Sequence, residues 1–239
     1  MKEGGKRLRK VVNLLKPMFA AGNTTGLIDK EAERLIKKLG GEASFKTVAR
    51  YRWSTCLPIN EQIVHTPPSG RVIKDGDLVC LDIGFYYQGF HTDYATTVFI
   101  GDKKETKITF FLETGRKALK KAIEKVKPGQ RLGIISQTIE KEIKKGGFFV
   151  IRELTGHGIG RTLHEDPFVP GHLDKPLDKT PIIDKGMTLA IEVIYSMGTE
   201  KLAYEKDKNW SSIVTVDGSL SACFEKTVAV TENQALVLT

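Results

Sequence analysis

The hydrophobic positions of the chain repeat in two successive parts with the same order of elements. Residues 6–17 and 116–128 both place apolar side chains at i, i+3, i+4 and i+7, which predicts an amphipathic helix. Each of these patterns stops at a Lys-Pro pair, where proline interrupts a helix. Residues 29–41 and 137–147 carry a second helical pattern, and each ends at two consecutive glycines. Each part therefore predicts a pair of helices.

A glycine turn and an apolar strand follow each pair of helices, in the segments IKDGDLVCLDIGF and IDKGMTLAIEVIY. Gly76 of the first segment aligns with Gly186 of the second, and six residues later Asp82 aligns with Glu192. A charged side chain in a buried strand is costly unless it is paired or bound to a metal ion. One such carboxylate could be an accident, but its recurrence at an equivalent position points to a shared function.

The repeat predicts an α+β fold with two pseudo-symmetric halves, at about residues 5–115 and 116–239. We expect an approximate two-fold relation between the halves and one central site between them. The full chain, 1–239, is then expected to be a single catalytic domain, a size that can bury a substantial core.

Each half adds a second carboxylate to the first. After Asp82 the chain reads as two strands joined by a tight turn near residues 87–89, which would place Asp82 and Asp93 opposite each other on one face. The second half offers a similar pair in Glu192 and Glu225. Like charges at such positions repel, and a dication between them would remove that penalty.

Histidine completes the candidate metal site. His157 lies in TGHGIG, between glycines that allow the backbone to approach a neighbour closely. Four carboxylates and one imidazole favour Mn, Fe, Co or Zn with open positions for water. Two ions held in this way can activate a bridging water and polarise a carbonyl. His91 lies two residues before Asp93, so we expect it to support the site rather than to act in catalysis.

Composition indicates which partners and which cellular location to expect. The net charge is +8, so RNA, for example on the ribosome, remains a possible partner. Because the sequence has no run of five basic residues, we prefer to interpret the lysines as solvated side chains along helices. The three cysteines are far apart in the sequence, which is typical of reduced thiols in the cytoplasm. No segment approaches about 20 apolar residues and no signal peptide is recognised, so we expect no membrane association. No oligomer signal is present, and a monomer is expected.

The motifs resemble methionine aminopeptidase of the type I class, from about Gly5 to Thr239. The resemblance rests on CLPINEQIVH, GDLVCLDIGFYYQGFHTD, GHGIGRTLHEDP, GMTLAIE and ACFEKTVAVTEN. It implies the pita-bread fold, with an antiparallel sheet covered by helices, and removal of the initiator methionine from nascent polypeptides. The interval between His164 and Glu192 leaves no room for the helical insertion that marks the type II class.

The resemblance also implies a role for each site residue. Asp93 and Glu225 would bridge two divalent metal ions, and Glu192 would in addition accept a proton from the attacking water. His164 would hydrogen-bond the scissile carbonyl or its oxyanion, and His65 would assist proton transfer near the substrate's amino end. The full metal-ligand set is Asp82, Asp93, His157, Glu192 and Glu225.

Further positions match the family's substrate pocket and a monovalent-cation site. The pocket candidates are Tyr51, Cys56, Leu163 and Trp210, joined by His65 and by Phe45 and Val48 at other parts of the wall. Asn60 and Ser221 would correspond to the monovalent-cation site.

Four residues depart from the family's usual pattern without removing a ligand. They are Thr66, Val193, Cys223 and Lys226, where the family usually has Gly, Pro, Gln and His. Two alternative functions remain: an X-Pro aminopeptidase or prolidase-like peptidase, which shares the fold and ligands, and a non-catalytic protein of this fold that binds peptides or RNA.

Overall fold

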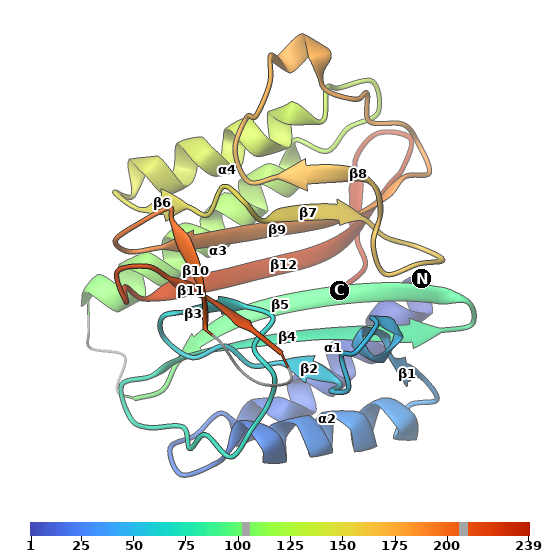
Figure 1. The fold of residues 1–239 in the computed structure, drawn as a ribbon. Coiled ribbons are helices and arrows are strands. Elements are labelled where there is room, and N and C mark those ends of the chain that lie inside the picture. Colours follow the sequence, from blue (N-terminus) through green and yellow to red (C-terminus); the bar gives the residue numbers. More distant parts are fainter. Residues whose placement is uncertain (102–105, 206–209) are drawn as a thin grey trace.

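The structure is a computed structural model that describes residues 1–101, 106–205 and 210–239. A large antiparallel sheet runs through the molecule in the order β1-β4-β5-β12-β9-β7-β8, and helices cover one of its faces (Figure 1). The helices are α1 (Lys2–Leu15), η1 (Lys16–Met18), α2 (Thr25–Lys38), η2 (Ser44–Thr47), α3 (Thr106–Glu124), α4 (Gly133–Lys145) and η3 (Leu177–Lys179). The strands are β1 (Glu42–Ala43), β2 (Thr55–Cys56), β3 (Gln62–Val64), β4 (Leu78–Tyr87), β5 (Phe90–Phe99), β6 (Phe149–Val150), β7 (Thr155–Gly158), β8 (Glu165–Pro170), β9 (Thr188–Ser196), β10 (Leu202–Glu205), β11 (Ser212–Thr215), β12 (Ser221–Val230) and β13 (Ala235–Val237).

The predicted helices are present. In α1 the side chains of Leu8, Val11, Val12 and Leu15 are all buried, as the apolar spacing requires. The helix α3 begins earlier than predicted, because Phe111 and other apolar residues before position 116 continue the buried stripe.

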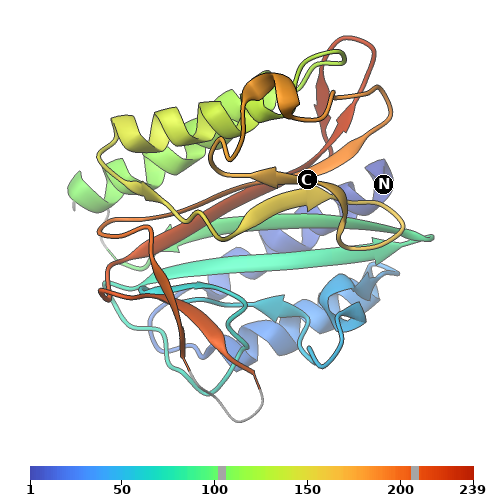
Figure 2. The same ribbon diagram turned by 45° about the horizontal axis from the view of Figure 1, so that its top comes forward.

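The helices α1, α2, α3 and α4 pack on one face of the sheet and leave the other face for the site. Leu81 and Ile83 of β4 pack with residues of α1 and α2, and Ile191 and Val193 of β9 pack with residues of α3 and α4. Side chains alternate between the faces of a strand. Asp82 therefore points away from the helices, as do the other carboxylates that share its face. In Figure 2 the blue helices α1 and α2 lie behind the strands, and the green and yellow-green helices α3 and α4 lie above them.

The two halves use the same local geometry where the candidate carboxylates begin. Gly76 has a φ of 89° and Gly186 has a φ of 90°, so the turns before β4 and β9 have matching left-handed glycines. The two halves meet where β5 pairs with β12 in the middle of the sheet.

The prediction that Asp82 and Asp93 lie opposite each other is wrong. In the β4–β5 hairpin Asp82 faces Ala95 and Asp93 faces Gly84, so the two carboxylates are diagonal neighbours. The turn consists of Gln88 and Gly89 alone, with φ values of 48° and 84°. Two-residue turns with positive φ at both positions suit the twist of a hairpin. The hairpin therefore closes later than predicted, and the pairing shifts by two residues.

A smaller sheet, β10-β11-β3, crosses in front of the large one (Figure 1). Its strand β3 leads directly into His65, which brings that side chain toward the open face. Within the part of the chain that the structure describes, none of the helices has the length and apolar character to cross a lipid bilayer.

Candidate metal centre

The predicted metal ligands occupy two adjacent rows across the sheet. The first row runs through four neighbouring strands as Asp82, Ala95, Glu225 and Glu192. In this row Glu225 and Glu192 are directly opposite, as the sequence predicted for the second half. The small side chain of Ala95 leaves space above the sheet between Asp82 and Glu225.

The second row holds the other two predicted ligands. Asp93 lies opposite Gly84 on one side, and His157 lies opposite Ala190, which is itself paired with Thr227. Side-chain donor atoms of Asp93, His157 and Glu225 all lie within 4.8 Å of one another, and His157 Nε2 is 3.6 Å from a Glu192 oxygen. The structure thus brings all five predicted ligands to one cavity floor.

The two halves do not repeat their second carboxylate. Asp82 and Glu192 are equivalent, but the residue opposite Asp82 is Ala95, whereas the residue opposite Glu192 is Glu225. Asp93 therefore does not correspond to Glu225, and the interpretation of two similar carboxylate pairs is wrong. The register of β5 moves the second carboxylate of the first half into the neighbouring row, where it faces the same cavity.

The four carboxyl groups of the cavity floor favour the binding of a cation. Burial raises the pKa of Asp93 to about 7. Burial, reinforced by neighbouring negative charges, holds the pKa values of the other three carboxyls well above their usual range. Glu225 is 2% exposed, and its Oε1 has no hydrogen-bond partner among the described residues. An oxygen-rich set with one imidazole and an unpartnered buried acceptor fits divalent cations.

His157 is held in the form that a metal ligand needs. Its Nδ1 hydrogen-bonds the carbonyl oxygen of Gly158 at 2.8 Å, which leaves Nε2 directed at the carboxylates. Burial lowers its pKa to about 4, so the ring is neutral at physiological pH. A Cβ atom on Gly156 or Gly158 would collide with the backbone of a neighbouring strand, which explains the glycines around this histidine.

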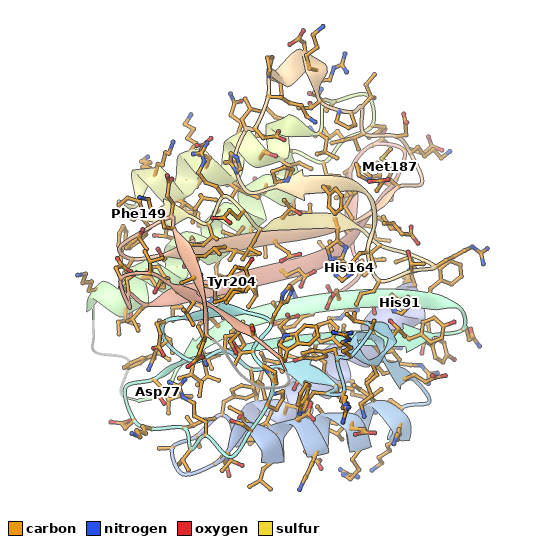
Figure 3. The ribbon with its side chains drawn as sticks, in the orientation of Figure 1. Asp77, His91, Phe149, His164, Met187 and Tyr204 are labelled. Atoms are coloured by element: carbon orange, nitrogen blue, oxygen red, sulfur yellow. The ribbon has the colours of Figure 1, made fainter. Side chains whose placement is uncertain are left out.

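Two further histidines lie at the rim of the cavity. The ring of His164 packs edge-on against that of His157 with centroids 4.5 Å apart, and desolvation lowers its pKa. Desolvation, together with His164, also lowers the pKa of His65, whose backbone adopts a left-handed φ of 56°. Figure 3 shows His164 between the two halves of the sheet and His91 farther out along β5. His91 is buried and bonds Ser44 Oγ at 2.9 Å.

An apolar cavity of about 510 Å³ extends from the carboxylates. The structure places every pocket residue predicted from the sequence in its wall, namely Phe45, Val48, Tyr51, Cys56, His65, Leu163 and Trp210. Val64, Leu154, Phe168 and Ile194 also line it and were missed. Their apolar character is ordinary for strand residues, so the sequence held no signal that distinguished them from the core.

One wall of this cavity depends on a buried carboxylate from α2. Asp29 Oδ1 accepts hydrogen bonds from Ser54 N–H and Thr55 N–H, both 2.9 Å, and from Thr55 Oγ1 at 2.8 Å. Thr55 in turn accepts a hydrogen bond from the Tyr51 hydroxyl at 2.8 Å through its carbonyl oxygen. Burial raises the pKa of Asp29. These contacts fix Tyr51 and Cys56 beside the ligands.

Comparison with known proteins identifies the family. The sequence profile of metallopeptidase family M24 matches residues 1–232, nearly the whole chain. The chain belongs to metallopeptidase family M24.

Named members of this family resemble the chain over its full length. It is 40% identical to methionine aminopeptidase 1 of Bacillus subtilis (strain 168), and the match covers 100% of this chain and 94% of the relative. The crystal structure of methionine aminopeptidase from Thermotoga maritima superposes with a TM-score of 0.94 at 38% identity, covering 100% of this chain and 94% of that one.

A prolidase shares the fold at lower similarity. Prolidase from Pyrococcus furiosus gives a TM-score of 0.78 at 23% identity, and the match covers 100% of this chain but 62% of that chain. The predicted pita-bread fold is therefore confirmed for this M24 member.

Two departures from the usual family pattern face away from the metal centre. Val193 belongs to the core beneath α3 and α4. Lys226 alternates with Glu225 along β12, so it points to the helical face, where its ammonium lies 4.1 Å from the centre of the Tyr94 ring. Neither Val193 nor Lys226 therefore contributes to the cavity lining of this M24 member.

Proposed function

We propose that this chain is a methionine aminopeptidase that removes the N-terminal methionine from nascent polypeptides. The observation that carries the proposal is the position of all five predicted metal ligands in the lining of one apolar cavity. A free amino-terminal residue can enter such a cavity with its first peptide bond above the carboxylates. The similarity to methionine aminopeptidases over the whole chain supports this substrate.

Asp82, Asp93, His157, Glu192 and Glu225 would hold two divalent metal ions, of Mn, Fe, Co or Zn. Such ions supply an activated water and polarise the scissile carbonyl. Because the ligands come from both halves, residues 1–239 would act as a single catalytic domain.

Side chains of the protein would then transfer the proton and stabilise the oxyanion. Glu192 lies at the edge of the first row and would accept the proton of the attacking water. The neutral His164 at the rim would donate a hydrogen bond to the oxygen of the tetrahedral intermediate. His65, also neutral at the rim, would assist proton transfer at the amino end of the substrate.

The apolar part of the cavity would select methionine. Tyr51, Cys56, Leu163 and Trp210 line this part of the wall, and the Tyr51 and Trp210 ring centroids are 5.0 Å apart. An unbranched thioether suits such a pocket because it is flexible and interacts well with aromatic rings.

A monovalent cation would bind where Asn60 and Gln62 meet the start of β12. Ser221 Oγ lies 3.1 Å from the carbonyl oxygen of Asn60 and 2.8 Å from that of Gln62. Oxygen atoms from Asn60, Gln62 and Ser221 thus converge, as a hard cation requires.

The charge distribution supports an encounter with the ribosome. Residues 116–145 contain ten basic and three acidic residues, and residues 1–16 contain six and one, so these helical segments carry +12 and the remainder −4. The segments form α1, the second half of α3, the loop that follows it and α4, and these helices lie on the face opposite the cavity. We propose that the chain acts as a monomer in the cytoplasm, with this basic face toward RNA.

A peptide panel tests the proposal. The protein is stripped with a chelator, reloaded with Mn²⁺, Fe²⁺, Co²⁺ or Zn²⁺, and supplied with Met-Ala and Ala-Pro peptides. Release of methionine from Met-Ala by at least one metal form is the expected result. Cleavage of Ala-Pro alone would favour a prolidase-like peptidase, and absence of metal binding would favour a non-catalytic binding protein.

A further inference from the structure

The two central strands of the sheet are held together in an unusual way. Direct pairing of β5 with β12 is confined to Tyr94–Ala95 and Glu225–Lys226. On either side of this short ladder, a threonine hydroxyl lies between the strands. Thr227 Oγ1 accepts a hydrogen bond from Asp93 N–H at 2.8 Å and donates one to the Asp93 carbonyl oxygen at 2.9 Å.

Thr97 makes the same pair of contacts on the other side of the ladder. Its Oγ1 accepts from Cys223 N–H and donates to the Cys223 carbonyl oxygen, both at 3.0 Å. The pairing of Ala95 with Glu225 makes Thr97 the counterpart of Thr227, since each lies two residues farther along its strand. The sheet therefore contains two equivalent hydroxyl bridges.

The bridges differ in what they hold. Thr97 hydrogen-bonds the backbone of Cys223, and Cys223 is not a predicted metal ligand. Thr227 hydrogen-bonds the backbone of Asp93, and Asp93 is a predicted metal ligand. Thr227 also lies in the second row, between Asp93 and the Ala190 that pairs with His157. It is fully buried.

One hydroxyl thus satisfies both backbone groups of Asp93 and ties that residue to the strand that carries Glu225. The Asp93 carboxylate is fixed in turn, because its Oδ1 accepts a hydrogen bond from Tyr94 N–H at 2.9 Å. Thr227 is itself held, since its N–H donates to Thr239 Oγ1 at 2.9 Å. Side chains that orient a metal ligand change metal affinity when they are removed.

We propose that Thr227 is a positioning residue that sets the separation of Asp93 and Glu225 and thereby the affinity of the site for divalent cations. The inference rests on the proposed metal centre. Thr97 is the matched control, because its replacement removes the equivalent bridge without touching a ligand.

The experiment compares Thr227→Val, Thr97→Val and Thr227→Ser with the wild-type protein. Each protein is stripped of metal, titrated with Mn²⁺ by calorimetry, and examined by the absorption spectrum of its Co²⁺ form. Thr227→Val should weaken Mn²⁺ binding by about 10- to 100-fold and alter the Co²⁺ spectrum. Thr97→Val should change Mn²⁺ affinity by less than about 1.5-fold and leave the Co²⁺ spectrum unaltered, although its melting temperature should fall by about as much as that of Thr227→Val. Thr227→Ser keeps the hydroxyl and should restore affinity.

Equal Mn²⁺ affinity in the two valine variants would overturn the proposal. If the wild-type chain itself binds no metal ion, the metal centre fails instead, so the two failures are distinguishable. Should Thr227→Val not fold, Thr239→Val removes only the partner of the Thr227 N–H. It should weaken Mn²⁺ binding by about threefold, and unchanged binding in that variant would equally contradict the inference.

Discussion

Replacing Asp93 with asparagine tests whether the clustered carboxylates of the cavity floor bind divalent cations. Asparagine keeps the shape of the side chain and the Oδ1 acceptor for Tyr94 N–H. It removes one of the four carboxyl groups from the cavity floor. We expect Asp93→Asn to stabilise the metal-free protein at pH 8 and to abolish its stabilisation by metal and its peptidase activity.

The magnitude follows from the protonation of Asp93. Its pKa rises from 3.8 to about 7 on burial, and a tenfold difference in proton affinity corresponds to about 1.4 kcal/mol. Because the folded-state pKa is raised, stability is fully present below pH 4 and is lost as the pH rises through about 7. The ionised side chain therefore costs the metal-free fold about 4 kcal/mol at pH 8, or a melting temperature about 10 °C lower.

Metal binding should reverse this penalty in the wild-type protein. At a Mn²⁺ concentration 100 times the dissociation constant, binding adds about 2.7 kcal/mol, which is a shift of about 5–10 °C for a chain of this size. Thermal unfolding by circular dichroism, with chelator or Mn²⁺ at pH 5 and pH 8, measures both effects. A metal-free Asp93→Asn protein that melts at or below the wild-type temperature at pH 8 would refute the reasoning. So would a Mn²⁺ shift of wild-type size in the variant.

Substitutions at three further positions test the pocket and the rim. Asp29→Ala should lower the free energy of unfolding by about 3–4 kcal/mol, since it leaves the Ser54 and Thr55 amides buried without their acceptor. Asp29→Asn keeps the acceptor and should cost less than about 1.5 kcal/mol; urea denaturation compares the two, and equal losses would argue against the assigned contacts. His164→Ala should lower kcat on a Met-Ala peptide by about 10²-fold with unchanged metal content by elemental analysis, and an unaltered kcat would exclude the oxyanion role. Leu163→Ala should raise KM for that peptide about tenfold with little change in kcat, and steady-state kinetics showing the reverse pattern would place Leu163 outside the methionine pocket.

Local patterns predicted much of this fold because they reflect local physics. The apolar spacing of α1 specifies a helix wherever one face can be buried, and the structure buries that face. The equivalence of Gly76 and Gly186 is likewise a local turn property, so the matching places of Asp82 and Glu192 could be predicted.

Strand register could not be predicted in the same way. It depends on where the hairpin closes, and a shift of two residues, which puts Ala95 instead of Asp93 opposite Asp82, leaves Asp93 on the same face of the sheet. The hydroxyl bridge of Thr227 joins residues 134 positions apart. No pattern within one segment marks such a contact, because threonine is common in strands for its shape alone.

The separation of the basic helices from the acidic cavity gives the molecule an electric dipole across its sheet. Near a polyanion, such a dipole orients the protein before any contact forms, so that the basic helices face the polyanion and the cavity faces away from it. A peptide that emerges beside that surface would then meet an open cavity rather than the back of the molecule. The effect acts over about a Debye length, so the rate of the proposed association with ribosomes should fall steeply with added salt while hydrolysis of a free Met-Ala peptide changes little.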